Sequence, residues 1–128
     1  MKALLDTSVL IGEIAPPEEL EAAVSVASIT ELHFGVLVTN EDEERARRLD
    51  RLAAVLATFD PVPITVDIAR EWGHLAATVA RRGGRPRRRQ IDLAIAATAI
   101  VEHVTLFTYN AADLRIISDL VDARTPTW

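Results

Sequence analysis

The chain of 128 residues contains no cysteine. This absence excludes a disulfide framework, a zinc site with thiolate ligands and a cysteine nucleophile. Long hydrophobic runs are also missing: the longest, Leu93 to Val101, is far shorter than the roughly 20 residues that a transmembrane helix needs. Asp6 interrupts the apolar N-terminus, so we expect no signal peptide. These absences together predict a cytoplasmic protein that makes no membrane contact.

The composition that remains is typical of a globular protein. Hydrophobic residues make up 49% of the chain, which predicts a single domain over residues 1–128 with one core. The net charge of −5 would by itself disfavour a nucleic-acid partner. However, residues 81–90 carry six arginines and no acid, whereas the segments on both sides are acidic.

Short β-prone segments alternate with segments of helical periodicity along the chain. This alternation predicts a three-layer α/β/α domain with a mostly parallel central sheet of four to five strands. We expect the strands at residues 3–5, 23–28, 62–65 and 104–107, and a weaker one at 120–121. We expect the helices at residues 7–11, 29–38, 41–58, 67–82 and 90–103, with the arginine-rich segment as a loop.

Carboxylates follow the predicted strands or open the predicted helices. Asp6 comes directly after the first strand, and Glu31 lies in the expected first turn of the helix after the second strand. Asp92 opens the apolar helix, while Asn110 and Asp113 follow the fourth strand. The carboxyl ends of parallel strands share one edge of a sheet, where ligands gather. We therefore expect these side chains to lie close together.

Partly buried carboxylates are costly unless a cation neutralises them. We expect no arginine to do so here, and therefore predict a hard divalent cation, Mg²⁺ or Mn²⁺, held by carboxylate and water oxygens. Such an ion activates water and polarises a phosphoryl oxygen, which points to phosphodiester hydrolysis. Each acid taken singly also fits a helix cap or a first-turn position, but those roles explain one acid at a time.

The arginine-rich segment is a candidate phosphate-binding element because its charge is concentrated next to Asp92. The alternative is a solvated loop that only improves solubility. The residues that we expect to contact RNA are Arg82, Arg85, Arg87, Arg88 and Arg89.

Four motifs resemble those of the PIN-domain nucleases, and in particular their bacterial toxin branch, the VapC family. They occur in family order and extend over essentially the whole chain. The motifs are Leu4-Leu5-Asp6-Thr7-Ser8-Val9-Leu10, Ala27-Ser28-Ile29-Thr30-Glu31-Leu32-His33-Phe34-Gly35-Val36, Ile91-Asp92-Leu93-Ala94-Ile95-Ala96-Ala97 and Leu106-Phe107-Thr108-Tyr109-Asn110-Ala111-Ala112-Asp113-Leu114.

The resemblance implies a Mg²⁺- or Mn²⁺-dependent endoribonuclease that acts as the toxin of a type II toxin–antitoxin pair. It implies an RNA substrate, a VapB-type antitoxin and a homodimer. Leu114 stands where phenylalanine is usual, and Asn110 adds no charge to a second metal position. The residues implied in catalysis are Asp6, Glu31, Asp92 and Asp113; Asn110 joins them as a metal ligand, and Thr7, Ser8 and Thr108 are supporting polar groups.

Other small α/β classes fit the sequence less well. A phosphoacceptor receiver domain needs a lysine after its last strand, and the only lysine is Lys2. A haloacid-dehalogenase-type phosphatase needs a second aspartate two residues after Asp6, where this chain has Ser8. The alternative that stays open is a catalytically inactive PIN-like module that binds RNA or protein.

Overall fold

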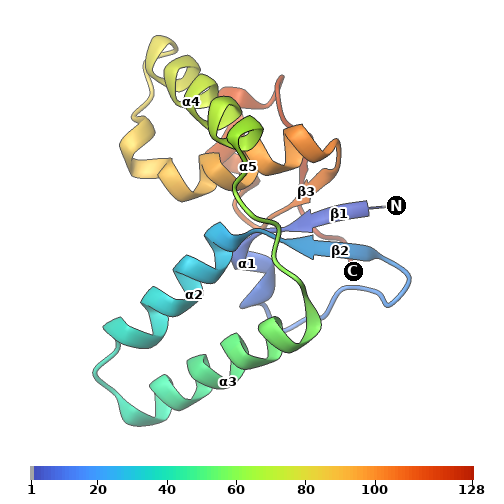
Figure 1. Cartoon of the computed structure of the whole chain (residues 1–128), viewed down its shortest axis with the longest axis vertical. Coiled ribbons are helices and arrows are strands. Elements are labelled where there is room, and N and C mark those ends of the chain that lie inside the picture. Colours follow the sequence, from blue (N-terminus) through green and yellow to red (C-terminus); the bar gives the residue numbers. More distant parts are fainter. Residues whose placement is uncertain (1) are drawn as a thin grey trace.

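The computed structural model describes residues 2–128 and contains a parallel sheet of four strands in the order β2-β1-β3-β4 (Figure 1). The central strands β1 and β3 are the first and third along the chain, so the connections cross the sheet. The strands are β1 (Lys2–Leu5), β2 (Glu21–Val24), β3 (Thr105–Phe107) and β4 (Ala123–Arg124).

Alternation along β1 divides the core into two clusters, because successive side chains of a strand point to opposite faces. Leu4 pairs in register with Leu106, and both belong to the cluster built with α4 (Val66–Arg81) and α5 (Gln90–Glu102). Leu5 belongs to the second cluster, with Val9 of α1 (Thr7–Leu10), and with residues of α2 (Val26–Val38) and α3 (Asp42–Thr58). This arrangement confirms the predicted α/β class with helices on both faces of the sheet.

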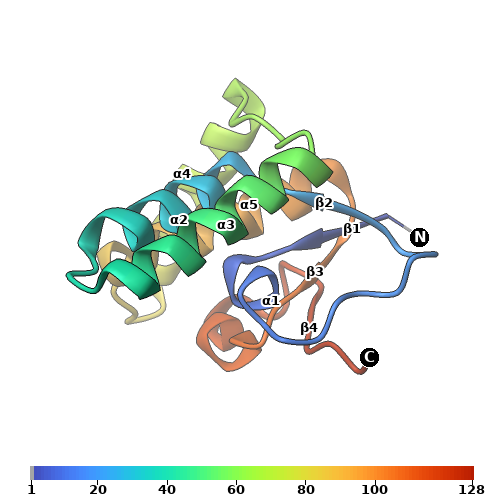
Figure 2. The same cartoon turned by 90° about the horizontal axis from the view of Figure 1, so that it is seen from below.

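The helices form two adjacent pairs. α2 and α3 lie side by side, and so do α4 and α5 (Figures 1 and 2). Every residue of α5 from Leu93 to Ala99 is buried, as its apolar sequence predicts. Two 3₁₀ helices complete the fold: η1 (Pro86–Arg89) and η2 (Ala111–Ile117). Within residues 2–128, none of the helices is long and apolar enough to cross a membrane.

The predicted second strand at 23–28 was too long. β2 ends at Val24, and α2 begins at Val26 instead of Ile29. The reason is Ser25, whose hydroxyl accepts a hydrogen bond from the backbone N–H of Ala27 at 3.0 Å. That N-cap starts the helix within a segment whose β-branched residues had indicated a strand.

The strands predicted at 62–65 and 120–121 were also wrong. Val62 makes only an isolated parallel bridge with Ser25, and its flanking prolines cannot donate to a ladder. The backbone N–H groups of Leu120 and Val121 bond back to the carbonyl of Ile117, which turns the chain at the end of η2. The last strand therefore starts at Ala123, three residues later than predicted, in β4.

On α3 the buried apolar face is narrow, because Leu49 and Leu56 are about half exposed while Leu52 and Val55 are buried. One further expectation needs correction. The arginine-rich segment is not an open loop throughout. Pro86 occupies the first turn of η1, a position that suits its missing N–H.

Candidate functional site

Asp6 occupies the junction between β1 and α1, at the carboxyl end of the sheet. Its backbone N–H donates to the carbonyl of Phe107 at 3.1 Å, which extends the pairing with β3 by one residue. Its carboxylate caps α1 by accepting from the N–H of Val9 at 3.3 Å. The cap of this helix is therefore Asp6 and not one of the hydroxyl residues, Thr7 and Ser8, that follow it.

The hydroxyls of Thr7 and Ser8 instead orient two carboxylates. Ser8 donates to Asp6 at 2.5 Å, and Thr7 donates to Glu31 of α2 at 2.5 Å. Because α2 starts earlier than predicted, Glu31 lies in its second turn rather than its first. One short segment after β1 thus connects Asp6 to Glu31.

Thr108 connects the loop after β3 to the segment after β1 that carries Ser8. Its side chain is fully buried, and its hydroxyl accepts from the backbone N–H of Asn110 at 2.9 Å and lies 3.5 Å from that of Ser8. Ser8 also accepts from the backbone N–H of Tyr109 at 2.9 Å. The loop after β3 is thereby fixed against the loop after β1.

The pKa of Asp92, in the first turn of α5, responds to the other three acids. Burial raises the pKa of Asp92, and the negative charges of Glu31, Asp6 and Asp113 raise it further, while Arg89 opposes them. The structure thus brings the four predicted acids close enough to interact. Asp6 and Asp92 also line a narrow hollow with Thr108 and Asn110.

Arg89 is a member of this cluster, contrary to the expectation that no arginine would neutralise these acids. Its guanidinium lies 2.8 Å from the Oδ2 of Asp113 and 3.9 Å from the Oδ2 of Asp92. The spacing contained the signal, because residues three apart are neighbours on a helical surface. The arginines had been expected to bind phosphate as one segment, so this pairing of Arg89 with the acids was not predicted.

The acids are not arranged around a common centre. Within residues 2–128, no three His, Asp or Glu side chains form a group that could hold an ion without rearrangement. Hydroxyls engage Asp6 and Glu31, and a guanidinium engages Asp113. An ion held by three of these acids therefore requires their carboxylates to move closer together.

The other arginines of the segment divide into two groups. Arg82 donates to Asp119 at 2.7 Å and to the carbonyl of Ile116 at 2.8 Å, and this pairing lowers the pKa of Asp119. Arg82 therefore joins the end of α4 to η2. In contrast, Arg85, Arg87 and Arg88 are exposed and have no ion-pair partner among residues 2–128.

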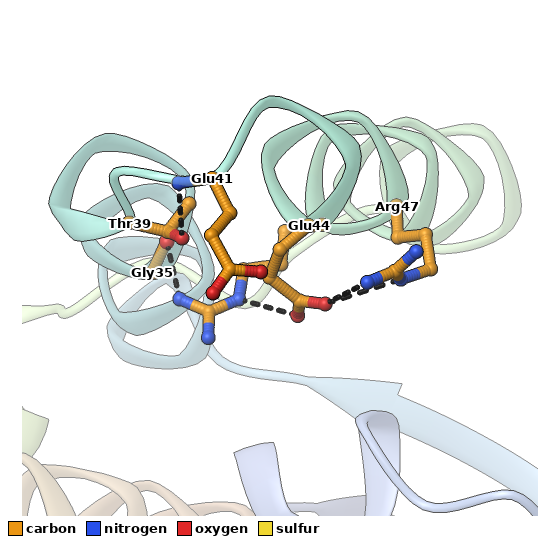
Figure 3. A network of polar contacts seen from close by, with 6 residues as sticks. Gly35, Thr39, Glu41, Glu44 and Arg47 are labelled. Atoms are coloured by element: carbon orange, nitrogen blue, oxygen red, sulfur yellow. Dashed lines mark hydrogen bonds and ion pairs between the residues drawn. The ribbon is translucent and has the colours of Figure 1, made fainter.

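A groove of about 390 Å³ opens beside Glu31 and Thr7, between α1, α2 and α3. Three of the residues that line this groove, Gly35, Glu44 and Arg48, belong to a network of polar contacts (Figure 3). Glu44 accepts from Arg47 at 2.6 Å and from Arg48 at 2.9 Å, and Arg48 also donates to the carbonyl of Gly35 at 2.7 Å. These contacts hold α3 against α2.

Comparisons with known proteins agree with this geometry. A family model described as PIN domain matches residues 3–119. Ribonuclease VapC8 of Mycobacterium tuberculosis is 36% identical over 104 residues, which cover 77% of this chain and 91% of that protein. Ribonuclease VapC5 of the same organism is 35% identical over 113 residues, which cover 84% of this chain and 82% of that protein.

The similarity extends to solved structures. The crystal structure of VapBC-5 from M. tuberculosis, a member of the VapBC family of toxin–antitoxin systems, contains a chain that aligns with a TM-score of 0.78 at 31% sequence identity. The alignment covers 97% of this chain and 96% of that chain.

Proposed function

Because the chain belongs to the PIN-domain family, and within it to the VapC group, we propose that it is an endoribonuclease that depends on Mg²⁺ or Mn²⁺. We further propose that it acts as the toxin of a type II toxin–antitoxin pair. The observation that carries this proposal is the convergence of Asp6, Glu31 and Asp113 on the partly buried Asp92.

The donor set fits a hard divalent cation. The cluster offers carboxylate oxygens and the amide oxygen of Asn110, which are ligands that Mg²⁺ and Mn²⁺ accept. Burial raises the pKa of Asp92, the charges of Glu31, Asp6 and Asp113 add to this effect, and Arg89 opposes it. Arg89 already supplies one positive charge there. Asp6, Glu31 and Asp92 would hold the ion, with Asp113 or Asn110 completing the site through water.

A bound ion of this kind would polarise a phosphoryl oxygen and lower the pKa of a water for in-line attack. The protein's part is to hold the ligands in register. Ser8 and Thr7 each donate a hydrogen bond to one carboxylate oxygen, which fixes the rotamers of Asp6 and Glu31 and leaves their second oxygens available. Thr108 holds the loop that carries Asn110. Cleavage would leave a 5′-phosphate and a 3′-hydroxyl.

Arg85, Arg87 and Arg88 are proposed to bind phosphates on either side of the cleaved bond. Their exposure and lack of ion-pair partners within residues 2–128 support this role. Such contacts position the chain without reading sequence. Replacing all three with glutamine should weaken RNA binding and reduce the salt slope by about 0.7 for each phosphate that the protein no longer neutralises.

The proposed partners are a VapB-type antitoxin and a second copy of the chain. The solved relative at 31% identity is described as part of a toxin–antitoxin system. Two side chains of α2, Phe34 and Leu37, are 65% and 73% exposed, which supports a protein partner on this helix. An inserted basic side chain of the antitoxin would suit the acidic cluster. Co-expression with the co-encoded small protein, followed by light scattering, measures both associations.

RNA cleavage by the purified chain and its Asp6→Asn variant, with Mg²⁺, Mn²⁺ or chelator present, tests the central proposal. Asparagine is a good N-cap, so this variant should keep α1. Asp50→Asn is the matched control, because Asp50 is an exposed acid of α3 outside the cluster. We expect cleavage by the parent and the control only, with 5′-phosphate ends. Equal cleavage by Asp6→Asn would contradict the proposed site. No cleavage by the parent with any divalent ion would leave the inactive binding module as the function.

A further inference from the structure

A second cavity lies away from the acids, between α4 and the turn formed by η1 and α5. Its volume is about 480 Å³, a size typical of small-molecule pockets. One wall comes from α4 and the other from η1 and the start of α5. The lining residues are Ala69, Trp72, Gly73 and Ala76 on the first wall, and Pro86, Arg87, Gln90 and Leu93 on the second.

Trp72 is the aromatic residue among those that line this cavity. It is half-buried, because it packs on the core cluster while lining the cavity. Small residues flank it on the same face of α4, and they leave the space beside the indole open. A Cβ added at Gly73 would meet no atom within 4 Å. Trp72 therefore belongs to both the core and the cavity.

The opposite wall adds polar groups to this apolar surface. Arg87 is exposed and has no ion-pair partner among residues 2–128. The carboxamide of Gln90 stands one turn along, at the start of α5. An indole face, an amide donor and acceptor, and a guanidinium match the three parts of a nucleotide: the flat base, its polar edge and its phosphate.

The cavity adjoins the acidic cluster. Gln90 and Leu93 line the cavity, whereas Asp92, in the same turn of α5, interacts with the other acids. Likewise, η1 directs Arg87 to the cavity and Arg89 to Asp113. The two places therefore lie on different sides of a single helical turn, which is about 10 Å across.

We propose that this cavity binds one unpaired base of the RNA, next to the nucleotide whose phosphate is cleaved. The base stacks on Trp72, and Arg87 holds its phosphate. The inference rests on the proposed ribonuclease function. It predicts a preference for single-stranded RNA, because a paired base cannot enter the cavity.

Tryptophan fluorescence provides a direct test, because the chain has only two tryptophans, Trp72 and Trp128. Trp128→Phe leaves Trp72 as the sole emitter and keeps an aromatic ring against Phe107, whose centroid lies 4.7 Å from that of Trp128. This variant is titrated with a single-stranded RNA hexamer in chelator, so that no cleavage occurs. The expected result is quenching of Trp72 by the hexamer. A hexamer of abasic sugar-phosphate should bind through the arginines without quenching.

A variant that fills the cavity leaves every native side chain in place. Gly73→Leu places a side chain in the open space beside Trp72, and leucine is a better helix former than glycine. We expect it to fold and to bind the RNA hexamer about 5- to 150-fold more weakly, which is the effect of removing one base–aromatic stack. Gly73→Ala, with its smaller side chain, should weaken binding less than Gly73→Leu does. Leu56→Ala, an exposed site on α3, controls for a general surface effect.

The outcomes separate this inference from the proposed function. Cleavage of RNA by Gly73→Leu at the parental KM and no quenching of Trp72 would overturn the base pocket and leave the ribonuclease intact. Quenching without cleavage would support the pocket and count against the nuclease. Loss of a dimer in Gly73→Leu, with unchanged affinity for the hexamer, would show that a second copy of the chain covers this cavity, and would also overturn the inference.

Discussion

Replacing Arg89 with glutamine should tighten the binding of Mg²⁺, although it removes a residue that contacts two acids of the site. In the structure the guanidinium of Arg89 takes the place of a cation between Asp113, at 2.8 Å, and Asp92, at 3.9 Å. An ion that takes Asp113 as a ligand must break this pair, and an ion held by Asp92 lies near the positive charge of Arg89. Glutamine keeps most of the length of the side chain and removes both effects.

Two contributions set the expected increase in Mg²⁺ affinity. The side chains of Arg89 and Asp113 are 42% and 39% exposed, so the pair itself contributes at most about 1 kcal/mol. An ion held by Asp92 would lie about as far from the guanidinium as that carboxylate does. At ~4 Å and with the screening of bulk water, repulsion between a single and a double positive charge costs about 2 kcal/mol. The affinity of Arg89→Gln for Mg²⁺ should therefore rise by roughly 5-fold if only the loss of the Arg89–Asp113 pair matters, and by about 150-fold if both contributions apply in full.

Isothermal titration of the metal-free protein with MgCl₂ at 0.1 M salt measures this directly, without any assay of cleavage. Arg88→Gln is the control, because it removes the same formal charge from an exposed neighbour that has no ion-pair partner among residues 2–128. Equal affinities in the two variants would refute the reasoning. So would weaker binding in Arg89→Gln, since Arg89 would then be holding the carboxylates in the ligating arrangement instead of competing with the ion.

Asp92→Asn should raise the Tm of the metal-free protein at pH 7. The folded state holds the pKa of Asp92 above its ordinary value of 3.8 and so binds the proton more tightly than the unfolded state does. The increase in Tm should therefore shrink as the pH falls toward 3.8. An increase in Tm that does not depend on pH would contradict this origin. Thr7→Val should weaken Mg²⁺ binding about 10- to 100-fold, because Glu31 loses the hydroxyl that orients it; titration calorimetry compares it with Thr7→Ser, which should bind normally. Gly84→Ala should lower the free energy of unfolding by about 1–3 kcal/mol, because the new Cβ would lie 2.7–2.8 Å from side chains of the core. Gly73→Ala should instead be neutral or stabilising in the same urea titration, because its Cβ meets nothing.

Much of the fold was predictable from local pattern. The apolar runs around Leu4 and Leu106 predicted the two central strands, and helical periodicity predicted α3, α4 and α5 close to their observed bounds. The secondary-structure predictions failed where a local hydrogen bond outweighed the propensity of the segment. Ser25 capped α2 inside a β-branched segment, and the turn at Ile117 delayed the last strand to Ala123.

The candidate acids were predictable for a topological reason. Parallel strands place their carboxyl ends at one edge, so Asp6 and Asp113, which follow β1 and β3, come to the same edge, where the helices that carry Glu31 and Asp92 also begin. The sequence did not predict which cations and hydroxyls meet these acids. Thr7 bonds to Glu31, which is 24 residues away along the chain, and such a contact depends on how α1 packs against α2.

The order of strands and helices, the carboxylates at one edge and the concentration of positive charge were thus determined by the sequence alone, because periodicity, capping and charge are local properties. The tertiary structure decided how the arginines divide. It paired Arg82 with Asp119, turned Arg89 into the acidic cluster and left Arg87 beside Trp72. These partners come from α4, η2 and α5, and only the packing of those elements fixes the distances between them.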